Sequence, residues 1–169
     1  MACSAVVLAG CSGIERPTLA PPAEPRTLEL GWVEPSASTG FTYRVERLSV
    51  GEDGWRAAIE VTNGSESAYR LGRGSVGLVL LDTASRAEVL LLTDDLTRAP
   101  PALTPTRSAP EPPPVLGPGA TWAAEIAGSE VLREGSVVRV LFGPYSRVGA
   151  RDVTASGTVL WVTEHAVRL

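Results

Sequence analysis

The sequence has no lysine, one histidine, one methionine and two cysteines, and each scarcity excludes a class of site. Both cysteines, Cys3 and Cys11, stand at the start of the chain. The remainder therefore has neither a disulfide framework nor a cysteine-based metal site. Zinc or copper sites need several His, Cys or Met ligands, and after Cys11 only His165 is available. We therefore expect no metal and no cofactor.

A concentrated charge of one sign is also missing. The formal net charge is -4, and the fifteen basic residues, all arginine, are interspersed with acidic ones. Proteins that bind nucleic acids usually carry clustered Lys and Arg. The composition therefore predicts no nucleic-acid partner.

Catalytic motifs are equally scarce. No G-x-S-x-G sequence accompanies His165, the single histidine, so a Ser-His-Asp site is not supported. Residues 72–77 match G-x-G-x-x-G and Asp94 follows, but a dinucleotide site also needs a helix after the glycines. Here a strand-length apolar run follows instead, at residues 78–81. We expect no catalytic residue and no enzymatic activity.

No apolar run approaches the roughly 20 residues that span a bilayer. Residues 2–10 are small and apolar, and they end in Leu8-Ala9-Gly10-Cys11. This motif resembles the lipobox of bacterial lipoproteins. The resemblance implies cleavage before Cys11 and acylation of its thiol, with palmitate among the chains, and Ser12 implies the periplasmic face of the outer membrane in a diderm cell. Because no basic residue precedes the apolar run, we interpret residues 1–10 as a truncated signal peptide.

Residues 11–26 form the next predicted unit, a lipidated cysteine followed by a proline-rich tether. Pro17, Pro21, Pro22 and Pro25 favour an extended, semi-rigid spacer. The alternative is a buried N-terminal strand that contains Cys11, but prolines are poorly tolerated in the continuation of a strand. The domain proper is predicted to span residues 27–169.

From Thr27 onward the pattern alternates with period two, which predicts strands. The alternation changes phase near Arg47, which predicts a β-bulge. Residues 51–54 form a predicted hairpin turn, and Asn63-Gly64 forms another. The strand over 75–81 is predicted to be covered on both faces, and residues 87–92 are assigned to a strand by their short length. About eight strands are expected, near residues 28–32, 43–50, 55–62, 75–81, 87–92, 121–126, 137–142 and 158–167.

Residues 93–119 contain eight prolines and are predicted to form a long irregular insertion. The stretch Pro110 to Pro114 favours polyproline II and is a possible partner-binding arm. The alternative is an insertion without function, which a surface loop tolerates.

Four short segments are similar to the immunoglobulin-like domains of uncharacterised bacterial surface lipoproteins. They are YRVERL (43–48), WRAAIEVTNG (55–64), GLVLLD (77–82) and LGPGATW (116–122). The resemblance implies an all-β, immunoglobulin-like antiparallel sandwich and a cell-envelope location, and it brings no catalytic residues.

Together these patterns predict an envelope lipoprotein, anchored at Cys11, that acts as a non-enzymatic protein-interaction or assembly module with an envelope protein as its partner. The alternative is an envelope small-ligand or glycan-binding module that uses exposed tryptophans. The four Trp residues mostly fall at apolar positions of the alternation, which favours a role in the core.

Overall fold

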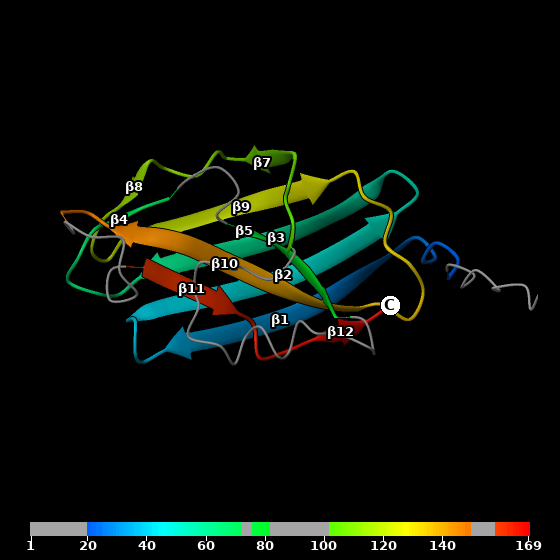
Figure 1. Ribbon diagram of the computed structural model, residues 1–169, viewed down its shortest axis with the longest axis horizontal. Coiled ribbons are helices and arrows are strands. Elements are labelled where there is room, and N and C mark those ends of the chain that lie inside the picture. The colour runs from blue at the N-terminus through cyan, green and yellow to red at the C-terminus, as the bar shows by residue number, and fades with distance from the viewer. Residues whose placement is uncertain (1–19, 72–75, 82–101, 150–157) are drawn as a thin grey trace, which may run out of the picture.

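The computed structural model describes residues 20–71, 76–81, 102–149 and 158–169. Over these ranges the chain is all-β, and two antiparallel sheets pack face to face (Figure 1). The β-sandwich expected from the sequence is thereby confirmed. The strands of the described ranges are β1 (Arg26–Ser36), β2 (Phe41–Gly51), β3 (Gly54–Asn63), β4 (Tyr69–Arg70), β5 (Val76–Leu81), β6 (Ala102–Leu103), β7 (Arg107–Ala109), β8 (Val115–Leu116), β9 (Thr121–Gly128), β10 (Val137–Arg147), β11 (Thr158–Val162) and β12 (Val167–Arg168).

The first sheet has the strand order β1-β2-β3-β9-β7. Strands β2 and β3 form a hairpin that closes at the pair Gly51 and Gly54, as the turn sequence predicts. Their register shifts between Val45 and Arg47, which confirms the predicted bulge. Side chains alternate strictly along β9, so its even-numbered residues face the core and its odd-numbered residues face outward.

The second sheet is organised around β10. On one side β10 pairs first with β5 and then with β4, and on the other side it pairs with β12 and β11. The register with β11 shifts between Phe142 and Tyr145, around Gly143-Pro144. Because Pro144 has no amide N–H, it cannot donate to a ladder, which accounts for the break.

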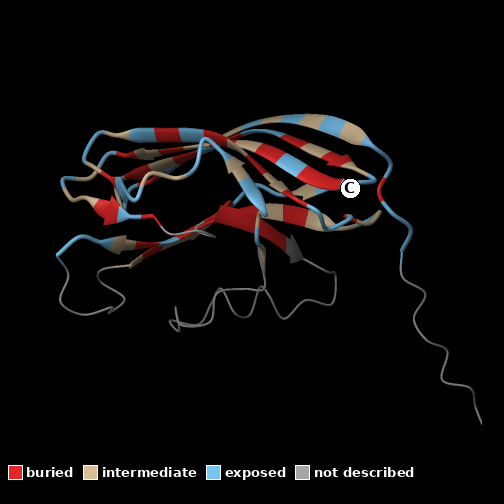
Figure 2. Cartoon of the chain, turned by 90° about the horizontal axis from the view of Figure 1, so that it is seen from above, coloured by how far each residue is buried: buried red, intermediate tan, exposed pale blue. Residues whose placement is uncertain are grey.

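The core fills the space between the sheets. Buried and exposed residues alternate along the strands (Figure 2). Since successive side chains of a strand point to opposite faces, the buried ones share one face of each sheet. Tyr43 packs against Phe142 with ring centroids 4.9 Å apart, and Phe41 packs against Tyr69 at 5.0 Å. The predicted strand over 75–81 corresponds to β5, whose Leu78 and Val79 are completely buried although they point to opposite faces.

Three expectations from the sequence need correction. First, the stretch 93–119 is not irregular throughout, because its described part, residues 102–119, contains the short strands β6, β7 and β8 at the sheet edges. Short strands of this kind raise the strand count of the described ranges to twelve. Second, the predicted last strand is divided into β11 and β12 by residues 163–166. The predicted strand 87–92 and the glycines at 72 and 74 lie outside the described residues.

The third correction concerns Asn63-Gly64, which is not a hairpin turn. Asn63 ends β3 in the first sheet, and the chain continues to β4 in the second. Asn63 is completely buried, and its amide donates to the carbonyls of Ser67, Leu116 and Gly117. Its side-chain oxygen accepts from the backbone and hydroxyl of Ser65. The residue therefore holds a corner between the sheets.

Candidate functional site

The predicted lipidation site, Cys11, lies outside the described residues, so its surroundings are not part of the structure. Within the described ranges, no group of three or more His, Cys, Asp or Glu side chains is arranged to hold a metal ion. The same ranges contain no helix long and apolar enough to cross a membrane.

A buried carboxylate stands out at one edge of the sandwich. Glu34 lies near the end of β1 on the strand face that points inward, and it is only 5% exposed. The residues before it on the same face, Leu28, Leu30 and Trp32, pack against the core. A carboxylate at the next inward position needs hydrogen-bond donors, because a buried charge is otherwise very costly.

The segment that follows β11 supplies those donors. Glu34 Oε1 accepts from the backbone amide of His165 at 3.0 Å and from its ring Nδ1 at 2.7 Å. Glu34 Oε2 accepts from Trp161 Nε1 and from the backbone amide of Glu164, both at 2.9 Å. Each carboxylate oxygen of Glu34 thus accepts two hydrogen bonds, and all four donors belong to one short stretch of chain, residues 161–165. We call Trp32, Glu34, Trp161, Thr163 and His165 the Glu34 cluster.

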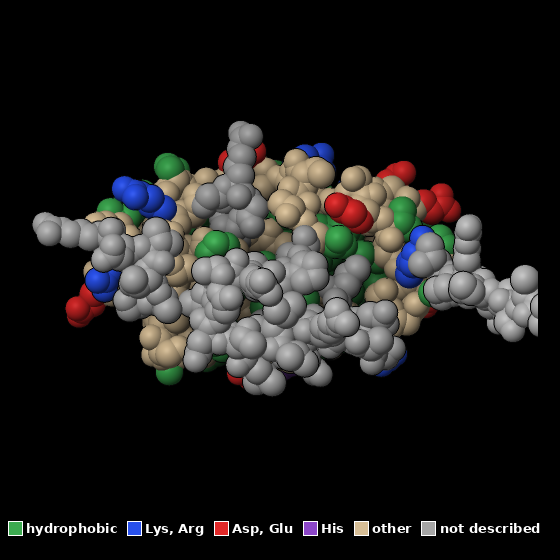
Figure 3. All heavy atoms as spheres, in the orientation of Figure 1, with side chains coloured by type: hydrophobic (Ala, Val, Ile, Leu, Met, Phe, Trp, Pro, Cys, Tyr) green, Lys and Arg blue, Asp and Glu red, His purple; other side chains and the backbone are tan. Residues whose placement is uncertain are grey.

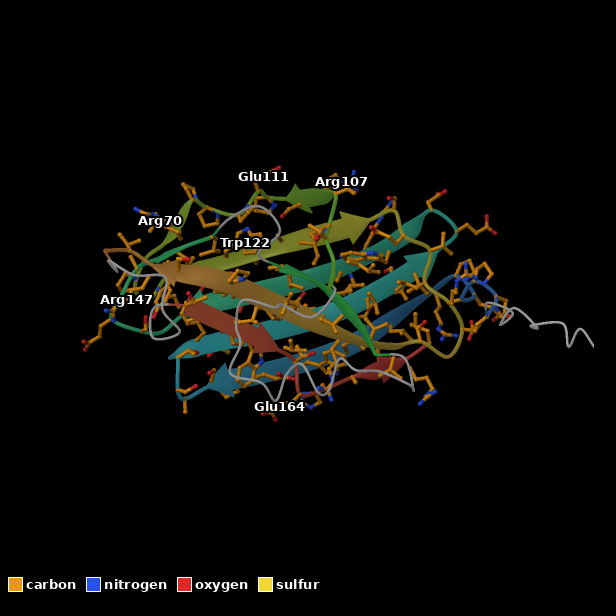
Figure 4. The ribbon with its side chains drawn as sticks, in the orientation of Figure 1. Arg70, Arg107, Glu111, Trp122, Arg147 and Glu164 are labelled. Atoms are coloured by element: carbon orange, nitrogen blue, oxygen red, sulfur yellow. The ribbon has the colours of Figure 1, made fainter. Side chains whose placement is uncertain are left out.

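Aromatic rings surround this carboxylate. The ring of Trp32 stacks on that of His165 with centroids 5.7 Å apart, and Trp161 stacks on Tyr43 at 5.6 Å. The hydroxyl of buried Thr163 accepts from the Val140 amide and donates to the His165 carbonyl. The neighbouring Glu164 lies at the outer edge of the sandwich (Figure 4). The Glu34 cluster therefore joins the first strand of one sheet to the last segment of the other.

The electrostatics of Glu34 reflect two opposing effects. Burial raises the pKa of Glu34, whereas the hydrogen bonds from His165, Glu164 and Trp161 lower it, and the resulting pKa lies below the ordinary value. Glu34 is therefore a carboxylate at neutral pH. A carboxylate can only accept, so His165 carries a proton on Nδ1.

This geometry resembles part of a catalytic arrangement, since an acid orients an imidazole. A nucleophile would have to lie on the other side of the ring, and no described side chain hydrogen-bonds to His165 Nε2. The nearby hydroxyl of Thr163 is already committed to two backbone groups. The His165 side chain is 57% exposed. The arrangement is thus suited to fastening the C-terminal segment, with the imidazole as one of its donors.

The sequence drew attention to His165 but not to its partner. A signal for Glu34 was present, because it continues the inward alternation of Leu30 and Trp32. An acid at an inward position indicates a buried partner, although alternation does not say which one. The partner is 131 residues away along the chain, and only the topology brings the two together.

The proline-rich segment and the tryptophans can also be placed. Residues 110–114 cross from β7 at the edge of the first sheet to β8 at the edge of the second, and Trp122 Nε1 donates to the Pro110 carbonyl at 3.3 Å. Glu111 lies at the outside of this crossing, beside β7 (Figure 4). Trp55 and Trp122 are buried, and Trp32 and Trp161 are half-buried against the core. The predicted role of the tryptophans in packing is consistent with these positions.

The described residues thus form an all-β sandwich in which the buried carboxylate of Glu34 hydrogen-bonds the first strand of one sheet to the last segment of the other. No family model matches the chain, and no curated protein or solved structure matches it either.

Proposed function

We propose that this chain is a bacterial envelope lipoprotein, anchored through acylated Cys11, whose β-sandwich serves as a non-enzymatic protein-interaction or assembly module. The observation that carries the proposal is the order of its parts. A lipobox-like Leu8-Ala9-Gly10-Cys11 is followed by a proline-rich spacer and then by a folded body. Two or three acyl chains on such a cysteine give stable anchoring, whereas one chain alone is marginal.

The attachment of the spacer supports this arrangement. Ala23 is buried and its amide donates to the Leu132 carbonyl, while the Glu134 amide donates to the Pro21 carbonyl. The end of the predicted tether is therefore hydrogen-bonded to residues 132 and 134 of the folded body. The chain enters at one end of the long axis (Figure 1). An anchor there would leave the sides and the far end of the sandwich free for contacts.

The chemistry of the described residues favours binding over catalysis. Glu34 and Thr163 use their oxygen atoms to hold backbone groups and the Trp161 indole. On the face drawn in Figure 3, arginine and acidic side chains are scattered among one another. The side chains drawn on this face form no basic patch of the kind that a nucleic acid would need, and mixed charges suit a specific protein partner.

Membrane fractionation in the native host tests the anchor. The wild-type chain is expected in the membrane fraction after a high-salt wash, and the Cys11→Ala variant in the soluble fraction. Cys3→Ala is the matched control and should remain with the membrane. Equal retention of the Cys11→Ala variant would contradict the anchor.

Photo-crosslinking in the same cells tests the module. Val115 and Val33 are 45% and 47% exposed, and they lie on edge strands of different sheets, β8 and β1. A crosslinking residue at one of these positions should give a discrete protein adduct that is lost in the Cys11→Ala background. If neither position gives an adduct, and purified chain also gives none with membrane extracts, the interaction module is refuted.

A further inference from the structure

The outward face of the first sheet contains a cross-strand row with an unusual composition. The register aligns Thr27 with Ser49, Ser49 with Arg56, Arg56 with Ala127, and Ala127 with Arg107. The row therefore begins with two hydroxyl side chains and continues with two arginines that lie on opposite sides of one methyl group. It has no acidic residue. Neighbouring strands are about 4.8 Å apart, so the two arginines start about 10 Å from each other and can reach the space above Ala127.

The other arginines of this face have partners. Arg44 lies 3.6 Å from Glu60, and Arg47 lies 3.7 Å from Glu125. Neither Arg56 nor Arg107, both exposed, forms an ion pair with any residue of the described ranges. The two arginines without an acid are thus the two that face each other across Ala127.

A groove of about 760 Å³ follows this row. Its floor is low at Ala127, which carries only a methyl group on this face, and the β2–β3 turn forms one wall. Four acids line the groove, and all of them lie outside the row. Glu125 lies 3.7 Å from Arg47, Glu29 is aligned with Arg47 in the register of β1 and β2, and Glu52 and Asp53 belong to the turn.

We propose that Arg56 and Arg107 bind a phosphate group across Ala127. Each guanidinium is a planar fork that donates two parallel hydrogen bonds to an oxyanion. A single fork already occupies both oxygens of a carboxylate, whereas a phosphate offers enough oxygens for two forks. The Ala127 methyl group leaves room for the anion between the arginines. The Thr27 and Ser49 hydroxyls, 2.9 Å apart, continue the polar row beyond Arg56.

The location suggests where the phosphate comes from. Thr27 lines the groove and lies four residues after Ala23, which is docked beside Leu132. The groove therefore opens at the end of the sandwich where the spacer enters. If the chain is anchored as proposed above, the phosphate belongs to the headgroup of an anionic lipid, and this assignment of the source rests on the proposed function. The phosphate site itself does not depend on the anchor.

Titration with inorganic phosphate tests the site. Full-length Cys11→Ala chain, labelled with ¹⁵N, is titrated at low ionic strength, where charge–charge attraction is least screened. The amides of Ala127 and Gly128 and the guanidinium signals of Arg56 and Arg107 should shift together. The double variant Arg56→Gln/Arg107→Gln should bind phosphate about tenfold more weakly or worse. Arg44→Gln, from the paired set on the same face, should bind within about twofold of the parent chain. Unchanged binding in the double variant, or no shift in the parent chain, would overturn the proposal.

Vesicles test the source. Phosphatidylcholine vesicles containing about one third phosphatidylglycerol should bind the same chain, whereas pure phosphatidylcholine vesicles should not. Inorganic phosphate should compete, and the double variant should lose the preference. Phosphate binding without any preference for the anionic vesicles would support the site and overturn the lipid source. Failure of the Cys11→Ala fractionation experiment would overturn the anchor and leave the phosphate titration unaffected.

Discussion

Replacing Glu34 tests whether the buried carboxylate holds the sandwich together. In Glu34→Gln the side chain keeps its size, but one oxygen becomes an amide that donates. Whether the amide nitrogen takes the place of Oε1 or of Oε2, two of the four donors lose their acceptor, since each carboxylate oxygen accepts from two groups. A buried donor without an acceptor costs about 1–3 kcal/mol, so we expect a loss of about 2–4 kcal/mol in the free energy of unfolding.

The measurement is urea unfolding of the full-length Cys11→Ala chain, followed by circular dichroism and tryptophan fluorescence. Glu29→Gln is the matched control, because Glu29 lies on the same strand but is exposed. Its effect should stay within about 0.5 kcal/mol. Hydrogen exchange should show the amides of Glu164 and His165 losing protection in Glu34→Gln, since both donate to Glu34. If Glu34→Gln lowered the free energy of unfolding by no more than the control does, the proposed stabilising role of the Glu34 carboxylate would be refuted.

The pH dependence gives an independent check. The pKa of Glu34 lies below its ordinary value of 4.5, so the unfolded chain binds a proton more readily than the folded chain does. The stabilisation from Glu34 is therefore complete above pH 4.5 and is lost as the pH falls through the folded pKa. The difference in unfolding free energy between the parent chain and Glu34→Gln should shrink at low pH. A difference that stayed constant down to pH of about 3 would contradict the hydrogen-bonded carboxylate.

Two further substitutions test other parts of the fold. Asn63→Asp places a carboxylate oxygen against the carbonyls to which the Asn63 amide donates. We therefore expect the free energy of unfolding to fall by about 3 kcal/mol or more, which thermal denaturation would detect. A melting temperature equal to that of the parent chain would contradict the role of Asn63 at the corner between the sheets. Gly128→Ala brings a methyl group to 2.5 Å from Trp55 Nε1 and should lower the free energy of unfolding by about 1–3 kcal/mol. In the control Gly117→Ala, the added methyl group has no atom within 4 Å other than those of Gly117 and its chain neighbours, so stability should change by less than about 1 kcal/mol. Equal effects of the two substitutions would argue against close packing at Gly128.

The local pattern was sufficient for the regular strands. The alternation in 55–62, the bulge near Arg47 and the turn at 51–54 all depend on neighbouring residues, and the structure confirms each of them. The proline-rich stretch was misjudged because β7 and β8 are only two or three residues long. Segments so short carry no measurable alternation, and only the sheet edges that they join define them as strands.

The buried polar groups could not be predicted from neighbouring residues. Glu34 and Asn63 are both buried and hydrogen-bonded to distant segments, and the sequence singled out neither of them as a buried group. Similarly, the row of Arg56, Ala127 and Arg107 exists only through the register of β3, β9 and β7. Pairings between segments far apart in the chain are set by the topology of the fold, and they cannot be inferred from composition or from the period of the hydrophobic pattern.

The mass of the N-terminal peptide distinguishes a chain that is lipidated at Cys11 from one that is not. Protein extracted with detergent from membranes of the native host would be digested and its first peptide measured by mass spectrometry. We expect a peptide that begins at Cys11 and carries the added mass of its acyl chains. A peptide that contains residues 1–10 joined to an unmodified Cys11 would contradict it.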